Sequence, residues 1–282
     1  MHSIGFSRIA RGILVAFAVV AAAPGADAQS APAGDITGLT PGMTYAEIVA
    51  ALEAREDLGL VETAEQWVRQ SNGVPTRQLV RAVDGVDCDT GEKFRKVGWG
   101  SECETLKGRL TPRKAIGQEI VVAFLGMPGK EVAGQIWRRV VFAEGENPSI
   151  SGLEEALVEK YGAPHVRQTE SGYYSTKHRF GATLLSWIYG PDGNRITEPD
   201  RLKATCVNGP QPWFTGGHSW NGGCGLTIRA EILPVKGNNL LAQELNVTVL
   251  DQQALLVALR QFDADLKAAV AAGAGKKKKP TL

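Results

Sequence analysis

The sequence predicts an α+β protein built from two similar units of a helix and an antiparallel sheet in tandem, completed by a C-terminal helix. Three observations lead to this prediction. A capping-box pattern that starts a helix occurs twice. Alternating strand-like runs that end in a hairpin follow each helix. Each half also carries two cysteines. Strands joined by short turns pair antiparallel, and helices then cover one face of the sheet.

The N-terminus has the pattern of a signal peptide, residues 1–28. His2, Arg8 and Arg11 give a positive start, residues 12–23 are apolar, and Ala26-Asp27-Ala28 is a small-x-small cleavage pattern. The apolar run is shorter than the roughly 20 residues that cross a bilayer. We expect cleavage near Ala28 and a periplasmic or secreted protein of a Gram-negative bacterium, with no transmembrane segment after cleavage.

The charge balance argues against a nucleic-acid partner. The signal contains two arginines and one aspartate, so cleavage reduces the 31 basic and 30 acidic side chains to 29 of each. The basic tail, residues 273–282, holds four of the remaining positive charges at Lys276, Lys277, Lys278 and Lys279. A nucleic-acid-binding body would instead show a basic patch on one face. The body ahead of the tail is therefore mildly acidic.

After a small, polar linker at residues 29–37, the first unit covers residues 38–146. Thr44 and Glu47 form a capping box ahead of an apolar helix face. Strand-like runs follow at residues 66–69 and 77–83, and a hairpin then joins residues 119–125 to 132–142.

The second unit covers residues 147–272. Ser151 and Glu154 form the second predicted capping box, and Gly162 and Pro164 end that helix. Strand-like runs follow, and Asp251 is the expected N-cap of a third helix that reaches about residue 271. The predicted strands cover residues 166–169, 183–189, 201–206, 226–233 and 240–250.

The entry into the first helix carries a family resemblance. Gly38-Leu39-Thr40-Pro41-Gly42-Met43-Thr44-Tyr45-Ala46-Glu47-Ile48 resembles the G-x-x-x-G-M-[ST]-x-x-[EQ]-[VI] entry of exported proteins of the SmpA/BamE type and of β-lactamase-inhibitor-like repeats. That resemblance implies helices leaning on an antiparallel sheet and a role in binding other envelope or extracellular proteins rather than in catalysis. The lipidated cysteine of the assembly lipoproteins is missing here. The chain thus resembles exported proteobacterial proteins of this kind without their lipid anchor.

Four cysteines remain after the predicted cleavage. An even number in an exported chain favours two disulfides, for which three pairings are possible. We favour Cys88–Cys103 and Cys206–Cys224, because each pair closes a short loop within one half of the chain.

No complete set of catalytic groups is visible in the sequence. The nearest match to a serine nucleophile elbow is Gly217-His218-Ser219-Trp220-Asn221, which has Asn221 where the turn needs a small residue. A zinc site from Cys206, His218 and Cys224 competes with the favoured disulfide. His165 is expected to begin a strand and His178 to be solvated. We predict no metal site, no cofactor and no nucleotide site.

The second cysteine loop is the main candidate for binding. Residues 208–225 combine six glycines and two prolines with Trp213, Phe214, His218 and Trp220, and Trp99 lies in the matching segment of the first half. Exposed aromatics on a tethered loop suit protein or sugar recognition. The alternative is that these rings fold back and cover the sheet. Likewise, the lysine tail suits either contact with anionic lipid or simple solubility.

Two functional hypotheses follow. The first is a non-enzymatic periplasmic binding or interaction module, with an envelope protein or a cell-wall glycan as partner. The second is an exported cell-envelope hydrolase whose site is assembled only by the fold. Two ionisable side chains that converge in a deep pocket would favour the hydrolase.

Overall fold

The computed structural model describes the main sheet, its helices and a small second sheet. The described residues are 31–32, 34–58, 60–66, 76–87, 93–97, 100–104, 110–112, 114–169, 181–197, 206 and 222–274. The predicted signal peptide, the lysine tail and most of the second cysteine loop lie outside them.

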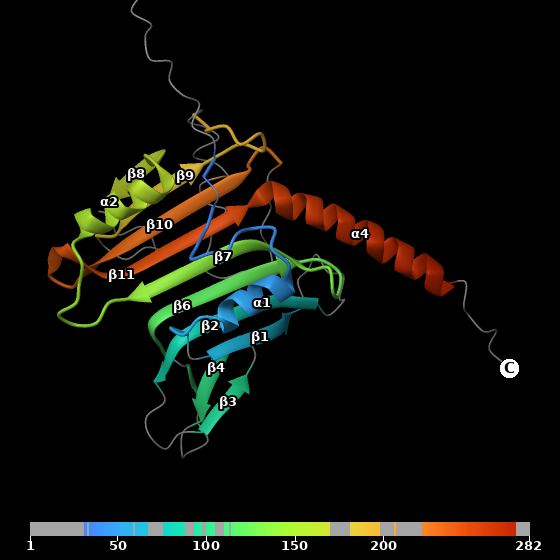
Figure 1. Cartoon of the computed structure of the whole chain (residues 1–282), viewed down its shortest axis with the longest axis horizontal. Helices are drawn as coiled ribbons and strands as arrows, with labels where there is room; N and C mark the ends of the chain where they lie inside the picture. Colours follow the sequence, from blue (N-terminus) through green and yellow to red (C-terminus); the bar gives the residue numbers. More distant parts are fainter. Residues whose placement is uncertain are drawn as a thin grey trace, which may run out of the picture.

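Eight antiparallel strands form one continuous sheet (Figure 1). Across the sheet the order is β1 (Leu60–Gln66), β2 (Thr76–Asp87), β6 (Lys114–Leu125), β7 (Val132–Val141), β11 (Asn238–Asp251), β10 (Leu226–Val235), β9 (Thr183–Ile188) and β8 (Val166–Thr169). A separate sheet contains β3 (Lys93–Val97), β4 (Gly100–Glu104) and β5 (Leu110–Pro112). The predicted α+β class with antiparallel sheets is confirmed.

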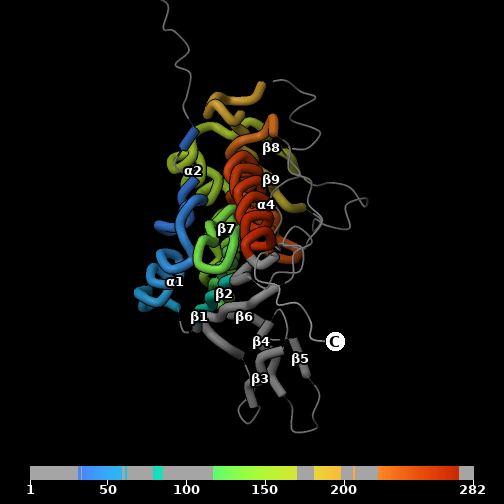
Figure 2. Tube along the Cα trace, turned by 90° about the vertical axis from the view of Figure 1, so that its right-hand side faces the viewer, coloured from blue at the N-terminus to red at the C-terminus, as the bar shows by residue number. Residues whose placement is uncertain are grey.

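The helices divide between the two faces of the large sheet (Figure 2). On one face, α1 (Tyr45–Glu53) packs on β1, β2 and β7, and α2 (Ile150–Tyr161) packs on β10 and β11. The C-terminal helix α4 (Gln252–Ala274) lies on the opposite face, where Leu255 packs with Leu125 and Leu250. The expectation that all helices share one face is therefore wrong for α4, because Leu255 and Phe262 bury themselves on the other side.

A single hydrophobic core runs beneath both α1 and α2. Ile48 and Leu52 of α1 are completely buried against the sheet. The same cluster continues through Ile136 on β7 and Val249 on β11 to Trp187 on β9. Because the core crosses the β7–β11 pair, the two halves of the chain bury their apolar surface together.

The first predicted helix start is confirmed. The Thr44 hydroxyl accepts a hydrogen bond from the Glu47 backbone N–H at 3.3 Å, and the Glu47 carboxylate accepts one from the Thr44 backbone N–H at 2.7 Å. The backbone N–H and the hydroxyl of Thr44 both donate to the Glu47 carboxylate, and they lower its pKa because they stabilise its charged form.

The second helix starts two residues earlier than predicted. Ser149, not Ser151, is the N-cap of α2, and its hydroxyl accepts a hydrogen bond from the Gly152 backbone N–H at 3.0 Å. Ser149 has the extended backbone that an N-cap needs, because it forms a β-bridge with Leu241. Glu154 instead pairs with Arg167 of β8 at 2.9 Å.

Both predicted hairpins are confirmed, and the turn of the second one is tighter than predicted. β6 pairs with β7, and β10 pairs with β11 as far as Val235 opposite Asn238, so the second turn is shorter than the predicted residues 234–239. The first strand lies earlier than the predicted residues 66–69, because β1 begins at Leu60, opposite Val83, soon after α1. Of the strand predicted at residues 201–206, only Cys206 is described, and it belongs to no strand.

The corrected cap of α2 can be tested by two single substitutions. We expect Ser149→Ala to lower the free energy of unfolding by about 1 kcal/mol, because the Gly152 N–H loses its acceptor. Ser151→Ala, the matched control, should change it by less than about 0.5 kcal/mol. Urea denaturation measures both values, and equal losses would contradict the assignment.

Candidate functional site

The predicted Cys206–Cys224 disulfide is confirmed. It joins residues 18 apart in sequence and holds their Cα atoms at 5.5 Å. Both cysteines are buried, and they pack with Ile188 at the end of β9 and with Ile196. The bond therefore fixes both ends of the intervening loop against one end of the sheet.

The disulfide also removes the alternative zinc site, because two of its three ligands are bonded to each other. In the first half, Cys103 lies in β4, opposite Phe94 and Thr111. Cys88 lies outside the described residues, so the Cys88–Cys103 bond stays a prediction. The same holds for the binding roles of Trp99, Trp213, Phe214, His218 and Trp220.

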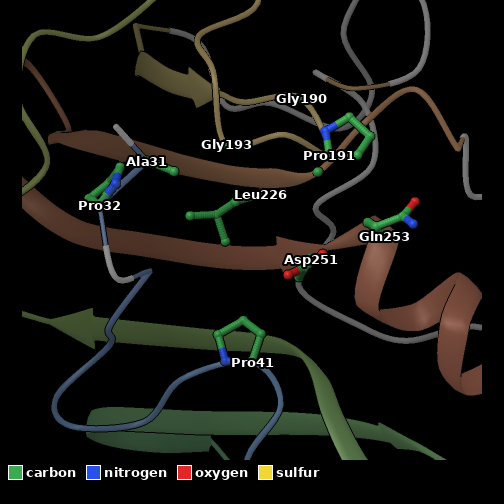
Figure 3. Close-up of a pocket in the computed structure, with 10 residues that line it drawn as sticks. Ala31, Pro32, Pro41, Gly190, Pro191, Gly193, Leu226, Asp251 and Gln253 are labelled. Atoms are coloured by element: carbon green, nitrogen blue, oxygen red, sulfur yellow. The ribbon is translucent and has the colours of Figure 1, made fainter. Parts of the chain in front are cut away.

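A cavity of about 280 Å³ opens at the same end of the sheet (Figure 3). Gly225 and Leu226, the two residues after Cys224, form part of its wall. The rest of the wall comes from four other segments of the chain, through the side chains and backbone of Ala31, Pro32, Pro41, Gly190, Pro191, Gly193, Asp251 and Gln253.

A tight turn at residues 190–193 forms one side of the cavity. The Gly190 N–H donates to the Asn194 carbonyl at 2.8 Å, and the Gly193 N–H donates to the Gly190 carbonyl at 3.0 Å. The Ala31 N–H then donates to the Gly193 carbonyl at 3.1 Å. These bonds hold the segment after the predicted signal peptide against this turn, a long-range contact that no local sequence pattern predicts.

At Gly225 the backbones of two chain segments pack closely against each other. A Cβ at this position would lie 2.2 Å from the Gly190 carbonyl oxygen, so a side chain cannot fit there without moving the backbone. Its N–H donates to the Tyr189 carbonyl at 2.8 Å, and its carbonyl accepts from the Gln252 N–H at 3.1 Å. Gly225 thus ties β9 and the first turn of α4 to the disulfide.

The cavity wall combines apolar surface with few polar side chains. Pro32, Pro41, Pro191 and Leu226 supply the apolar part. Asp251 is the ionisable side chain of this wall, and its Oδ1 already accepts the Ala254 N–H at 2.8 Å as the predicted N-cap of α4. Acid–base chemistry needs a second ionisable group, which the described residues of this wall do not supply.

His165 lies close to this end of the sheet and has a structural role, as the sequence predicted. It directly precedes β8, and its Nδ1 accepts the Ile188 N–H at 2.7 Å. Its ring stands edge-on to Tyr189, with ring centroids 5.0 Å apart. Burial, helped by the charge of Arg195, lowers the pKa of His165 to about 4. His178 and His218 lie outside the described residues.

No family model matches this chain, and neither characterised proteins nor solved structures gave a significant match. The resemblance to SmpA/BamE-type and β-lactamase-inhibitor-like proteins therefore stays a prediction. Within the described part of the chain, no helix combines the length and apolar character needed to cross a bilayer. The fold and the cavity define an α+β protein with a small recess next to the residue that follows Cys224.

The disulfide should contribute measurably to stability. We expect the Cys206→Ala/Cys224→Ala double variant to lose about 3 kcal/mol of unfolding free energy, because a loop of this length regains its entropy in the unfolded chain. Guanidinium denaturation under oxidising conditions measures the loss. A double variant as stable as the oxidised wild type would contradict a native Cys206–Cys224 bond.

Protonation of His165 should destabilise the fold at mildly acidic pH. Its pKa in the folded protein is about 4, below the ordinary value of 6.5. The neutral ring is therefore favoured by folding, and this contribution is complete above pH 6.5 and is lost as the pH falls towards 4. Asp57, whose pKa is lowered to about 2, acts in a lower window, from 3.8 downwards.

Thermal unfolding between pH 7 and pH 4.5 tests this expectation. The wild-type midpoint should fall across the range, and His165→Asn, which keeps an acceptor for the Ile188 N–H, should show a shallower decline. Parallel curves for the two proteins would refute a role for His165.

Proposed function

We propose that this chain is an exported, non-enzymatic binding module that holds a partner at the loop between Cys206 and Cys224 and in the cavity at its base. The observation that carries this proposal is the disulfide, which joins the two ends of a segment rich in aromatic residues, together with the cavity that Gly225 and Leu226 line directly after Cys224. Aromatic side chains on a tethered loop bury large areas at low entropic cost. A periplasmic or secreted location, after cleavage near Ala28, agrees with a stable disulfide.

The internal arrangement supports a tandem origin for the fold. Outward from the central β7–β11 pair the order is β6, β2, β1 on one side and β10, β9, β8 on the other. Each set of four strands follows its own helix, α1 or α2, in the chain. We propose that the units at residues 38–146 and 147–272 are copies of one design, each contributing half of the sheet.

The chemistry of the cavity favours a protein partner over a glycan. The described side chains of the wall offer Asp251 and Gln253 for hydrogen bonds beside three prolines and a leucine, and the backbone adds further polar surface. An apolar side chain or a proline-rich stretch of an envelope protein suits such a wall. The rival hydrolase would need a second ionisable side chain beside Asp251, and the described wall does not supply one.

The lysine tail gives the module a second, weaker contact in this proposal. The last turns of α4 are exposed, with Val270 65% accessible, and Figure 1 shows the helix running beyond the edge of the sheet. The run from Lys276 to Lys279 follows this projecting helix. Clustered lysines attract anionic lipid headgroups at about 1 kcal/mol each near the surface.

Photo-crosslinking tests the proposed binding surface. A benzoylphenylalanine in place of Gln253, at the cavity wall, should capture a defined protein in the cell envelope. The same residue in place of Leu240, which is 78% exposed at the opposite end of β10 and β11, should not.

The aromatic loop is then tested in the same assay. Replacing Trp213, Phe214 and Trp220 by alanine should reduce capture from position 253 by about tenfold or more, the loss expected for aromatic anchors. Undiminished capture, with circular dichroism showing the native fold, would disprove a role for the loop.

A further inference from the structure

Arg138 occupies an unusual place on the helix-bearing face of the sheet. It lies on the central strand β7, directly between Ile120 on β6 and Val247 on β11. Both neighbours belong to the core, and Arg138 itself is half-buried. Burying a guanidinium is costly unless an opposite charge compensates for it.

Within the described residues, Arg138 has no carboxylate partner. Its Nε–H donates a hydrogen bond to the Gln118 side-chain oxygen at 3.2 Å. Among the described residues, this uncharged amide is its hydrogen-bond acceptor. Both Nη groups, which form the fork that binds an oxyanion, have no such acceptor there. The adjacent Arg139, on the other face of β7, is paired with Glu244 at 2.9 Å.

The nearest acidic group is already occupied. Asp57 accepts two hydrogen bonds from Arg55, at 2.8 and 2.6 Å, and a third from the Gln118 amide. Arg55 also approaches the same Gln118 oxygen at 3.5 Å. Arg55 therefore neutralises Asp57 and only the Gln118 oxygen is shared with Arg138, which leaves one uncompensated positive charge.

The electrostatics agree with this geometry. Burial lowers the pKa of Arg138, and the charge of Arg55 lowers it further, whereas Asp57 and Tyr161 oppose the effect. The Tyr161 hydroxyl donates to the Asp35 carbonyl at 2.7 Å and so does not neutralise Arg138. An anion bound at Arg138 would compensate the buried charge and offset the repulsion from Arg55.

Arg138 keeps part of its surface exposed on the face of the sheet that α1 and α2 cover. α1 packs on β1, β2 and β7, while α2 packs on β10 and β11, so the central pair lies between them (Figure 1). Val140 and Leu245, which face each other across that pair one step further along the strands, are partly exposed.

We propose that Arg138, with Gln118 and Arg55 beside it, forms a binding site for a single carboxylate group. One uncompensated positive charge matches a monovalent carboxylate, and the planar fork of an arginine matches its two oxygens. A phosphate dianion would need more positive charge than this site provides. The carboxylate comes either from a small acid or from an acidic side chain of a peptide.

The site is tested by nuclear magnetic resonance on the purified protein with labelled arginine. Titration with sodium acetate should move the Arg138 Nε–H signal along a saturable curve with a dissociation constant on the order of millimolar, as one charge-assisted contact supports. Sodium chloride at equal ionic strength should leave that signal in place. A signal that moves equally with both salts would overturn the proposal.

Variants separate binding from a structural role. Arg138→Gln should abolish acetate binding, as followed by calorimetry, without lowering the thermal midpoint, because it removes an uncompensated charge. Arg138→Lys should keep the charge but weaken binding several-fold. Arg167→Gln, which removes one charge from the distant strand β8, should bind acetate like the wild type. Unchanged acetate binding by Arg138→Gln would overturn the proposal, as would an equal loss of binding in Arg167→Gln.

Two further ligands identify the source of the carboxylate. If an acetylated, amidated peptide with one glutamate binds at least tenfold more tightly than acetate, while its glutamine counterpart does not bind, the natural ligand is a peptide side chain. Equal affinities for acetate and the glutamate peptide indicate a small acid. Tighter binding of inorganic phosphate than of acetate would refute the carboxylate specificity.

Discussion

The antiparallel pairing of β7 with β11 joins the two halves of the protein, and seven residue pairs from Glu244–Val141 to Leu250–Gln135 hold it together. These strands lie far apart in the sequence, so their pairing carries a large cost in chain entropy. It is offset because Ile136 and Val249, which face each other across the pair, belong to a core shared by both helices. Without this pairing, each half would be a four-stranded sheet with one side of its core open to water.

The two faces of the sheet carry their charged residues in different surroundings. On the face that α1 and α2 cover, β7 presents Ile136, which belongs to the core, and then Arg138. On the other face Arg139 pairs with Glu244, and Arg81 pairs with a Glu119 side chain that is 4% exposed. Such ion pairs need both partners, because either charge alone would be buried without compensation. Gly134 leaves room for Leu255, since a Cβ there would lie 1.9 Å from its side chain, and α4 can therefore approach the sheet closely.

Local signals predicted local structure well. The capping box at Thr44, both hairpins, the Asp251 cap and the Cys206–Cys224 bond each depend on residues close together in the sequence, and each was predicted correctly. The start of α2 was not, because Ser149 and Ser151 compete for the same role and a β-bridge to the distant Leu241 decides between them. The candidate cavity escaped prediction for the same reason, since its wall brings together five segments whose positions follow from the strand order.

The arginine site shows most clearly why spacing alone could not reveal function in this chain. Arg55, Gln118 and Arg138 come from three separate parts of the sequence, and none belongs to a recognisable motif. What distinguishes Arg138 from Arg139 is the face of the strand on which each lies. The alternation of a β-strand places one guanidinium beside Glu244 and the other over the core. An arginine beside valines and isoleucines in a strand sequence is therefore ambiguous, and the partners on neighbouring strands determine whether it stabilises the fold or is left to bind something else.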